Sequence, residues 1–304
     1  MDAQDSAFPA PLKRELAVAV VVLSAVVFSL NGLIIRQIEA ATEWQIVFYR
    51  AIGLLTGICL VFVWRHRRRT LASLRASGWL AVMAGPLQGF GTSLFVIALL
   101  HTTVANAMMM LCATPLFATI LAWAFLGEKV GWATAVAISV TIVGVSLMAV
   151  DGVSTGTLIG NLAALSNAFT FAIFIAFLRR GRGVDMVPAV MVGALCSILI
   201  GFTMAHDLSP PIRDILICVA WGFVIQTAGM SLMMWGSRAL PAAEISLITM
   251  VEFILAPTWA WLVIGELPTA MSALGGGLVF VTMFAWSLRR KLLRRPVPVR
   301  PSGG

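Results

Sequence analysis

Long apolar runs, separated by short polar, Pro- or Gly-containing connections, make up most of the chain. A bilayer core about 30 Å thick needs about 20 apolar residues of helix, so each run is long enough to cross a membrane. The pattern therefore predicts an all-α integral membrane protein. Its ten predicted spans are residues 16–36, 44–64, 79–100, 104–126, 131–150, 157–178, 187–205, 213–236, 242–263 and 269–288.

Composition supports a lipid environment. Hydrophobic residues make up 60% of the chain and charged residues only 11%, whereas soluble domains carry about 25% charged residues. The net charge of +8 does not indicate nucleic acid, because the basic residues lie in short clusters between apolar runs. The four cysteines are dispersed within apolar runs and lack the close spacing of a metal site. We predict no metal, no cofactor and no nucleic-acid partner, with the lipid bilayer as the surrounding medium.

The distribution of Lys and Arg predicts the orientation. Eighteen of the 21 basic residues fall on one side of the ten-span topology, and basic loops stay on the cytoplasmic side. We therefore expect a multi-pass protein of the cell inner (plasma) membrane with both termini in the cytoplasm. Residues 1–15 form a cytoplasmic N-terminal segment and residues 289–304 a basic cytoplasmic tail. The first run lacks an A-x-A cleavage pattern, so we interpret it as a retained span.

An internal repeat relates the two halves. A shift of 138 positions aligns spans three to five with spans eight to ten, and Gln88 then coincides with Gln226 and Trp123 with Trp261. Each repeat has five spans, an odd number, so the second must enter the membrane from the opposite side. The sequence thus predicts two inverted repeats, residues 16–150 and 151–288, around a central cavity. This is an architecture of transporters, whose similar halves exchange conformations around a midplane site.

Two related stretches carry a family resemblance. Residues 122–128 read AWAFLGE, residues 260–266 read AWLVIGE, and Arg50 lies near the start of span two. With the five-plus-five pattern, these features resemble the drug/metabolite transporter superfamily, in its ten-helix type with two EamA domains. The resemblance covers about residues 14–290 and is greatest to exporters of aromatic and neutral amino acids. It implies that spans one to four and six to nine surround the cavity, with spans five and ten outside it.

Polar side chains inside apolar spans are candidates for substrate binding, because an unpaired polar group in hydrocarbon is costly. Gln88 and Gln226 are repeat equivalents near the middles of spans three and eight. We expect them on opposing walls of one cavity; alternatively, each amide ties neighbouring helices together. The other uncharged candidates are Asn31, Thr92, Asn106, Asn167, Trp221 and Trp259.

Two charged residues lie well inside predicted spans, away from the span ends. Glu252 is near the centre of span nine, where a low dielectric favours the protonated acid, so it would bind a substrate ammonium group or carry a proton. The alternative is a structural bridge to Arg50. Arg50 would bind a substrate carboxylate, or else hold a helix end or extend toward the membrane surface. His101, in the loop between spans three and four, is a weaker candidate for a proton relay.

Three local motifs carry further expectations. Pro115 and Pro257 are expected to interrupt spans four and nine and allow bends. Residues 152–156 match the G-x-S-x-G nucleophile pattern, but we expect them in a short external connection rather than in a strand-to-helix turn. The sequence has no Walker lysine motif and no HExxH. We therefore predict no catalytic residues, and an integral membrane enzyme is a remote alternative.

These observations favour an alternating-access secondary transporter that exports small organic metabolites, with neutral or aromatic amino acids as substrates. Substrates with phosphate groups are disfavoured, because they typically need several basic groups in the cavity and only Arg50 is available there. The main alternative is a multidrug exporter of lipophilic cations, with Glu252 as the counter-ion. We also expect a homodimer through the outer helices.

Overall fold

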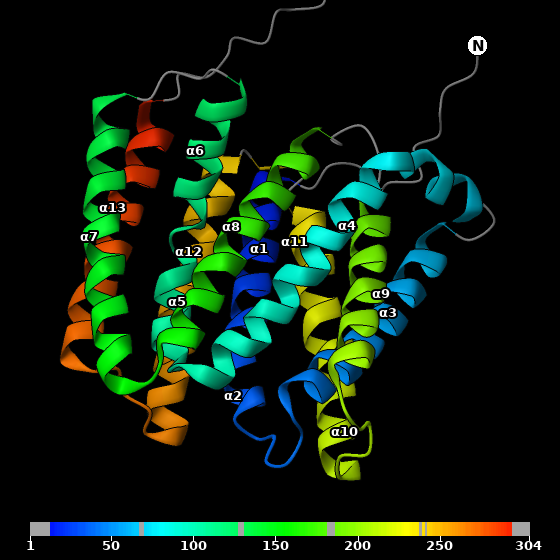
Figure 1. The fold of residues 1–304 in the computed structure, drawn as a ribbon. Coiled ribbons are helices and arrows are strands. Elements are labelled where there is room, and N and C mark those ends of the chain that lie inside the picture. The colour runs from blue at the N-terminus through cyan, green and yellow to red at the C-terminus, as the bar shows by residue number, and fades with distance from the viewer. Residues whose placement is uncertain are drawn as a thin grey trace, which may run out of the picture.

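The computed structural model describes residues 13–66, 70–126, 131–180, 186–236, 239–240 and 242–293. Every regular element in these residues is a helix (Figure 1). Ten helical segments are long and apolar enough to cross a membrane. Their ends lie within a few residues of the predicted ones. The all-α fold with ten spans is therefore confirmed.

The first five spans come from seven helices. Spans one and four are each divided in two, because the chain leaves the regular helix at Leu30 and at residues 112–113. The helices are α1 (Arg14–Ser29) and α2 (Asn31–Ile35), α3 (Glu43–His66), α4 (Thr70–His101), α5 (Val104–Leu111) and α6 (Thr114–Leu126), and α7 (Trp132–Thr155).

The second five spans contain one further interruption, a π-helix in the middle of span eight. The helices are α8 (Leu158–Arg180), α9 (Val187–Met204), α10 (Ile212–Ala220) with the π-helix η2 (Trp221–Gln226) and α11 (Thr227–Gly236), α12 (Ala242–Ile264), and α13 (Ala270–Leu293).

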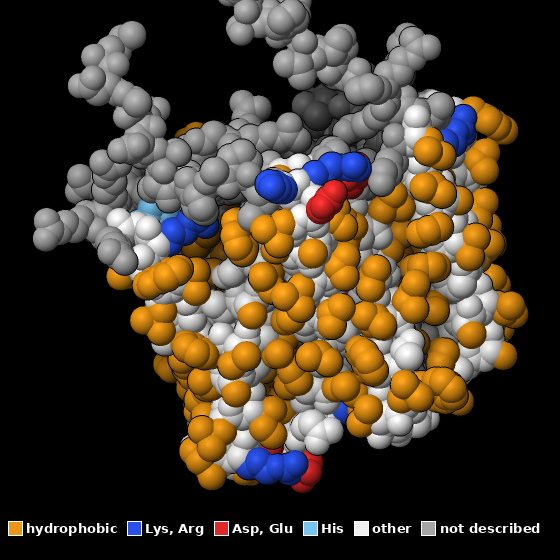
Figure 2. All heavy atoms as spheres, turned by 180° about the vertical axis from the view of Figure 1, so that it is seen from behind, with side chains coloured by type: hydrophobic (Ala, Val, Ile, Leu, Met, Phe, Trp, Pro, Cys, Tyr) orange, Lys and Arg blue, Asp and Glu red, His pale blue; other side chains and the backbone are white. Residues whose placement is uncertain are grey.

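The outer surface is apolar at mid-height. Figure 2 shows hydrophobic side chains over the middle of one face, with Lys, Arg, Asp and Glu gathered toward its two ends. Leu199, Leu274 and Val281 are each more than half exposed, and they are three of many large apolar side chains on a surface of the kind that lipid covers. The chain is a multi-pass membrane protein.

The two repeats pack on each other rather than separately. Span three (α4) packs against spans six and seven (α8 and α9), and span eight (η2 and α11) packs against spans one and two (α1 and α3). Span eight is the repeat counterpart of span three, and spans one and two are the counterparts of spans six and seven. The two sets of contacts are therefore equivalent under the repeat. Spans two and seven are also neighbours, and α7 pairs with α13 at one edge of the bundle (Figure 1). The core therefore lies between the repeats.

Glycines allow the closest of these contacts. A Cβ atom on Gly53 would overlap the carbonyl oxygen of Val219, and one on Gly222 would overlap that of Arg50. Gly57 packs in the same way against Thr227. Only residues without a side chain let α3 and span eight approach at backbone distance, as in other small-residue contacts between membrane helices.

Two local expectations need correction. Pro115 does follow a break, since α5 ends at Leu111 and α6 begins at Thr114, but Pro257 lies inside α12, which continues to Ile264. Membrane helices tolerate proline because neighbouring groups satisfy the freed carbonyl. Residues 152–155 are not a connection but the last turn of α7, which ends at Gly156 with φ 75°.

Candidate functional site

A buried arginine is the centre of a polar cluster within the spans. The side chain of Arg50 on α3 is 2% exposed. Its Nη2 donates to the carbonyl oxygen of Thr92 on α4 at 2.9 Å, and its guanidinium carbon lies 5.0 Å from the centroid of the Trp221 ring. Its Nε and Nη1 atoms are buried and have no hydrogen-bond partner among the described residues. Arg50 is therefore held on one side and keeps two donors for another group.

The three residues of this contact lie at a common depth. Arg50 is seven residues from the start of α3, and Trp221 is nine from the start of α10. Thr92 is nine residues from the end of α4, at the same end of the bundle. At 1.5 Å per residue, the three positions lie about 10–14 Å from the helix ends, well inside a hydrocarbon core about 30 Å thick.

The π-helix η2 positions Trp221. This side chain is 1% exposed, and its indole Nε1 donates to Asn31 Oδ1 at 2.6 Å. Asn31 lies where α1 gives way to α2, and its Nδ2 donates to the carbonyl oxygen of Phe28 at 2.7 Å. Both partners thus come from interruptions in otherwise regular spans. Single-turn π segments are frequent at functional sites.

Next to the contact between Arg50 and Thr92, a pair of hydroxyl groups joins spans three and seven. Thr92 Oγ1 lies 3.1 Å from Ser197 Oγ on α9, and Ser197 also donates to the carbonyl oxygen of Gly89 at 2.9 Å. The sequence analysis did not single out Ser197, which is 1% exposed. Its position as a polar residue inside a strongly apolar span was the sequence signal that could have identified it.

Trp259 reaches the same region from span nine. Its indole Nε1 donates to Ser29 Oγ at 3.0 Å, two residues before Asn31. The structure thus brings Asn31, Arg50, Thr92 and Trp221 into one continuous set of contacts, with Trp259 beside it.

The two glutamines are both buried but lie in different interfaces. Gln88 is 3% exposed, packs against Gly193 of α9, and has no partner for either amide atom among the described residues. It is one helical turn from Thr92 on the same face of α4. Gln226 is 5% exposed and ends η2, which packs on α3. No hydrogen bond joins the two, and their placement on opposing cavity walls stays a prediction.

The remaining amides lie apart from Arg50. Asn106 on α5 is 3% exposed, and its Oδ1 has no partner in the part of the chain that the structure describes. Asn167 on α8 is 9% exposed and packs against Gly91 of α4. Both belong to the packing of spans three, four and six.

Glu252 is half-buried in the middle of α12. Its carboxylate interacts electrostatically with the thiol of Cys112, at the break between α5 and α6. Within the described ranges it forms no ion pair with Arg50 and no hydrogen bond. The structural bridge to Arg50 that the sequence left open is therefore not formed.

A separate polar network ties together one end of the bundle. Arg36 Nε donates to Glu266 at 2.8 Å, and its other nitrogens donate to the carbonyl oxygens of Leu99 at 2.6 Å and Thr102 at 2.9 Å. Glu266 also accepts from the backbone N–H of Val104 at 2.5 Å, at the start of α5. The ends of spans one, three, four and nine are thereby joined. The sequence analysis had used Glu266 only as a marker of the repeat.

Two further contacts belong to the same end. Asp214 accepts from the backbone N–H groups of Ala40 and Ala41 at 2.8 and 2.9 Å. His101 is an exposed residue at the end of α4, where its Nε2 lies 2.6 Å from a carboxylate oxygen of Glu43. Among the described residues, these polar contacts across spans lie at the end of the bundle that holds the start of α5.

Ten apolar spans in two interlocked repeats, with a polar cluster buried between them, define a membrane protein of the transporter type. Residues 15–150 and 158–288 both match the EamA-like transporter family, and the chain belongs to this family.

Two relatives agree with this assignment, and one solved structure agrees with the fold. An uncharacterized transporter of Synechocystis sp. is 26% identical, over 88% of this chain and 84% of the relative. The pseudopaline exporter of Pseudomonas aeruginosa is 23% identical, over 90% of this chain and 96% of the relative. A crystal structure with 18% sequence identity has the same fold, with a TM-score of 0.64 over 94% of this chain and all of that one. Both relatives are described as transport proteins.

Proposed function

We propose that this transporter works by alternating access and exports a small organic metabolite across the inner membrane, with neutral and aromatic amino acids as its substrates. The observation that carries this proposal is Arg50, whose buried guanidinium keeps two nitrogen donors without a partner among the described residues.

A carboxylate is the group that best complements these donors. It accepts charge-assisted hydrogen bonds from a guanidinium, and such bonds are roughly twice as strong as neutral ones. A buried cation without a counter-ion is also costly, so an anionic ligand group relieves a cost that is already present. One guanidinium suits one carboxylate.

The rest of an amino acid has candidate partners on span nine. Glu252 offers a negative charge from span nine for the substrate ammonium group, and it has no competing ion pair among the described residues. Trp259 follows Glu252 by seven residues on α12, about two helical turns, and is partly buried. Its indole would contact an aromatic or apolar side chain.

Alternating access follows from the repeat. In the proposed topology the second five spans run opposite to the first, so that exchanging the conformations of the halves opens the site to the other side. The network of Arg36 and Glu266 would then close the external end in the state described here. The sequence has no ATP-binding motif, so a substrate gradient, counter-exchange or protons would supply the energy. Outward transport agrees with the exporter among the relatives.

A second candidate function is export of lipophilic cations. The unpaired carboxylate of Glu252 favours it, because a half-buried anion suits a cationic substrate. In that case Arg50 has only the structural role of holding the carbonyl of Thr92.

Counterflow in proteoliposomes distinguishes the two. Vesicles containing the purified chain are loaded with one unlabelled amino acid at a time, and uptake of the same labelled amino acid is measured, with cationic dyes as competitors. We expect neutral or aromatic amino acids to exchange and the dyes to leave this exchange unchanged. Exchange of dyes alone would support the second function, and the absence of any amino acid exchange would reject the proposed substrate class.

A further inference from the structure

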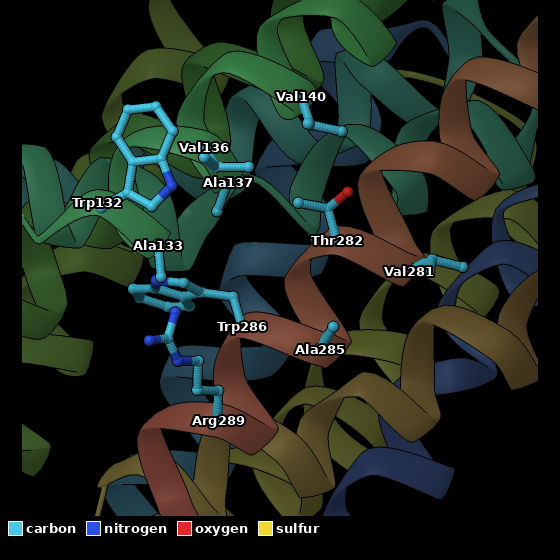
Figure 3. A pocket seen from close by; sticks show the side chains of 10 residues that line it. All are labelled: Trp132, Ala133, Val136, Ala137, Val140, Val281, Thr282, Ala285, Trp286 and Arg289. Carbon is cyan, nitrogen blue, oxygen red and sulfur yellow. The ribbon is translucent and has the colours of Figure 1, made fainter. Parts of the chain in front are cut away.

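The outer helix pair, α7 and α13, is held together at two places. Near mid-length, Gly144 and Gly275 face each other so closely that a Cβ atom on either would meet the carbonyl oxygen of the other. At one end, the buried carboxylate of Asp151 accepts hydrogen bonds from the hydroxyls of Thr269 and Ser272. Toward the opposite end, where α7 begins and α13 ends, the two helices leave a groove between them (Figure 3).

The groove has a volume of about 450 Å³. Small side chains open it, since alanine occurs three times along its walls. The aliphatic side chains of Val140 and Val281 lie at its inner end. Among the lining residues, only Thr282 has a hydroxyl group. Its lining residues are Trp132, Ala133, Val136, Ala137, Val140, Val281, Thr282, Ala285, Trp286 and Arg289.

The outer end of the groove has the chemistry of a membrane surface. Trp132 is 83% exposed, while Trp286 is 7% exposed and donates from Nε1 to Thr134 Oγ1 at 3.2 Å. Arg289 is exposed, and Figure 3 shows its guanidinium pointing toward the Trp286 ring. Trp is enriched where the hydrocarbon meets the headgroups, so this end of the groove lies at the headgroup level.

The length of the groove fits one leaflet. Val281 and Arg289 are eight positions apart on α13, which is about 12 Å along a helix. Half of a hydrocarbon core about 30 Å thick is about 15 Å. A lipid whose headgroup lies at Arg289 would therefore place its chain along the whole groove.

We propose that this groove is a binding site for one phospholipid with an anionic headgroup. The phosphate lies against the Arg289 guanidinium, and one acyl chain lies between α7 and α13. Arg290 and Lys291 follow directly in the sequence and add positive charge to this region of the chain. Basic residues next to a span attract anionic lipids. The site is separate from the Arg50 cluster, so the proposal does not rest on the substrate class.

A second copy of the chain fits the groove less well than a lipid. A two-fold dimer places the same surface of each copy against the other. An interface over this groove would bring two Arg289 guanidinium groups toward each other without an acidic residue in the groove lining to separate them.

Native mass spectrometry of the full chain tests the proposal. The protein is extracted from bilayers that contain equal amounts of phosphatidylglycerol and phosphatidylcholine, and the lipids that remain bound are counted. One basic residue near an anionic headgroup corresponds to about a fivefold preference, so we expect phosphatidylglycerol to be retained about fivefold over phosphatidylcholine. Arg289→Gln should remove most of this preference. Lys13→Gln, an exposed basic residue outside the groove lining, should keep it.

A second pair of variants tests the groove without changing charge. Ala285→Phe fills it and should reduce retention of both lipids, whereas Leu199→Phe, on the exposed face of α9, should not. The proposal is overturned if Arg289→Gln keeps the preference, if Ala285→Phe retains lipid like the unaltered protein, or if the wild-type protein is recovered as a lipid-free dimer that Ala285→Phe dissociates.

Discussion

At the scale of single residues, the position of Arg50 depends on the planar shape of its side chain. One edge of the guanidinium reaches the Thr92 carbonyl, and the plane lies near the Trp221 ring. A lysine would keep the charge but has neither the fork nor the flat face. The site therefore depends on arginine itself and not only on a positive charge.

Arg50→Lys should accordingly impair transport. Hydrogen bonds to charged groups contribute about 1.5–3 kcal/mol, so we expect the counterflow rate of the best amino acid substrate to fall at least about tenfold. Arg213→Lys is the control, since Arg213 is half-exposed and pairs with Glu39 at the surface. Equal rates for Arg50→Lys and the unaltered protein would contradict a role of Arg50 in carboxylate binding.

Glu252→Gln tests the other end of the proposed substrate. The substitution keeps size and removes charge, so we expect the KM for neutral amino acids to rise about tenfold, as for loss of one charge-assisted bond. Folding should be unaffected, because Glu252 makes no hydrogen bond with the described residues. Glu39→Gln on the exposed loop is the control. Normal transport by Glu252→Gln at every pH would remove this residue from the site.

At the scale of elements, the π-helix η2 determines what span eight presents to span two. It begins with Trp221 and ends with Gln226, and Gly222 within it lies against the backbone of Arg50. The glycine brings the two helices to backbone distance, and the wide turn directs the indole toward Asn31. Loss of either feature would separate Trp221 from the guanidinium.

Gly222→Val is expected to destabilise the protein. Forcing extra methyl groups into a packed contact typically costs about 1–3 kcal/mol, which should lower the melting temperature of the purified chain. Gly277→Val is the matched control, because a Cβ atom there meets nothing within 4 Å. Equal shifts in melting temperature for the two variants would show that the contact between η2 and α3 is not tightly packed.

The sequence predicted the regular parts of this fold and the break before Pro115, but not its other irregular parts. Apolar length identified all ten spans, because it depends only on local composition. The π-helix had no such signal, since it arises from how span eight packs on spans one and two. Pro257 was expected to break α12, yet the helix continues through it.

The same limit applies to the candidate site. Arg50, Asn31, Thr92 and Trp221 stood out as polar or aromatic residues inside apolar spans, and the structure joins them. Ser197 did not, because one serine is inexpensive in a helix that can bond it to its own backbone. Only the packing of α9 against α4 shows that Ser197 reaches Thr92.

At the scale of the whole molecule, the network of Arg36 and Glu266 connects four spans at one end. Removing it should favour states in which that end is open. We expect Glu266→Ala to increase the rate at which a membrane-impermeant thiol reagent labels Cys218 by at least about fivefold. This is the lower end of the range for energetic coupling between two sites in a protein. Cys218 is 1% exposed and lies in α10.

The labelling experiment needs two safeguards. The other three cysteines are replaced by alanine, so that only Cys218 reports. Glu39→Ala breaks an exposed ion pair with Arg213 and should leave the labelling rate unchanged. If both variants label equally fast, the Arg36 and Glu266 network does not control access.

The interlocked repeats also constrain how the protein is made. Arg50 is synthesised early and Trp221 much later, because they lie in different halves of the chain. A nascent chain with only its first five spans inserted has a guanidinium in the hydrocarbon before its aromatic neighbour exists. We therefore expect the first half to be stable in the membrane only once the second has emerged, and a chain that stops between the halves to be a substrate for proteolytic quality control.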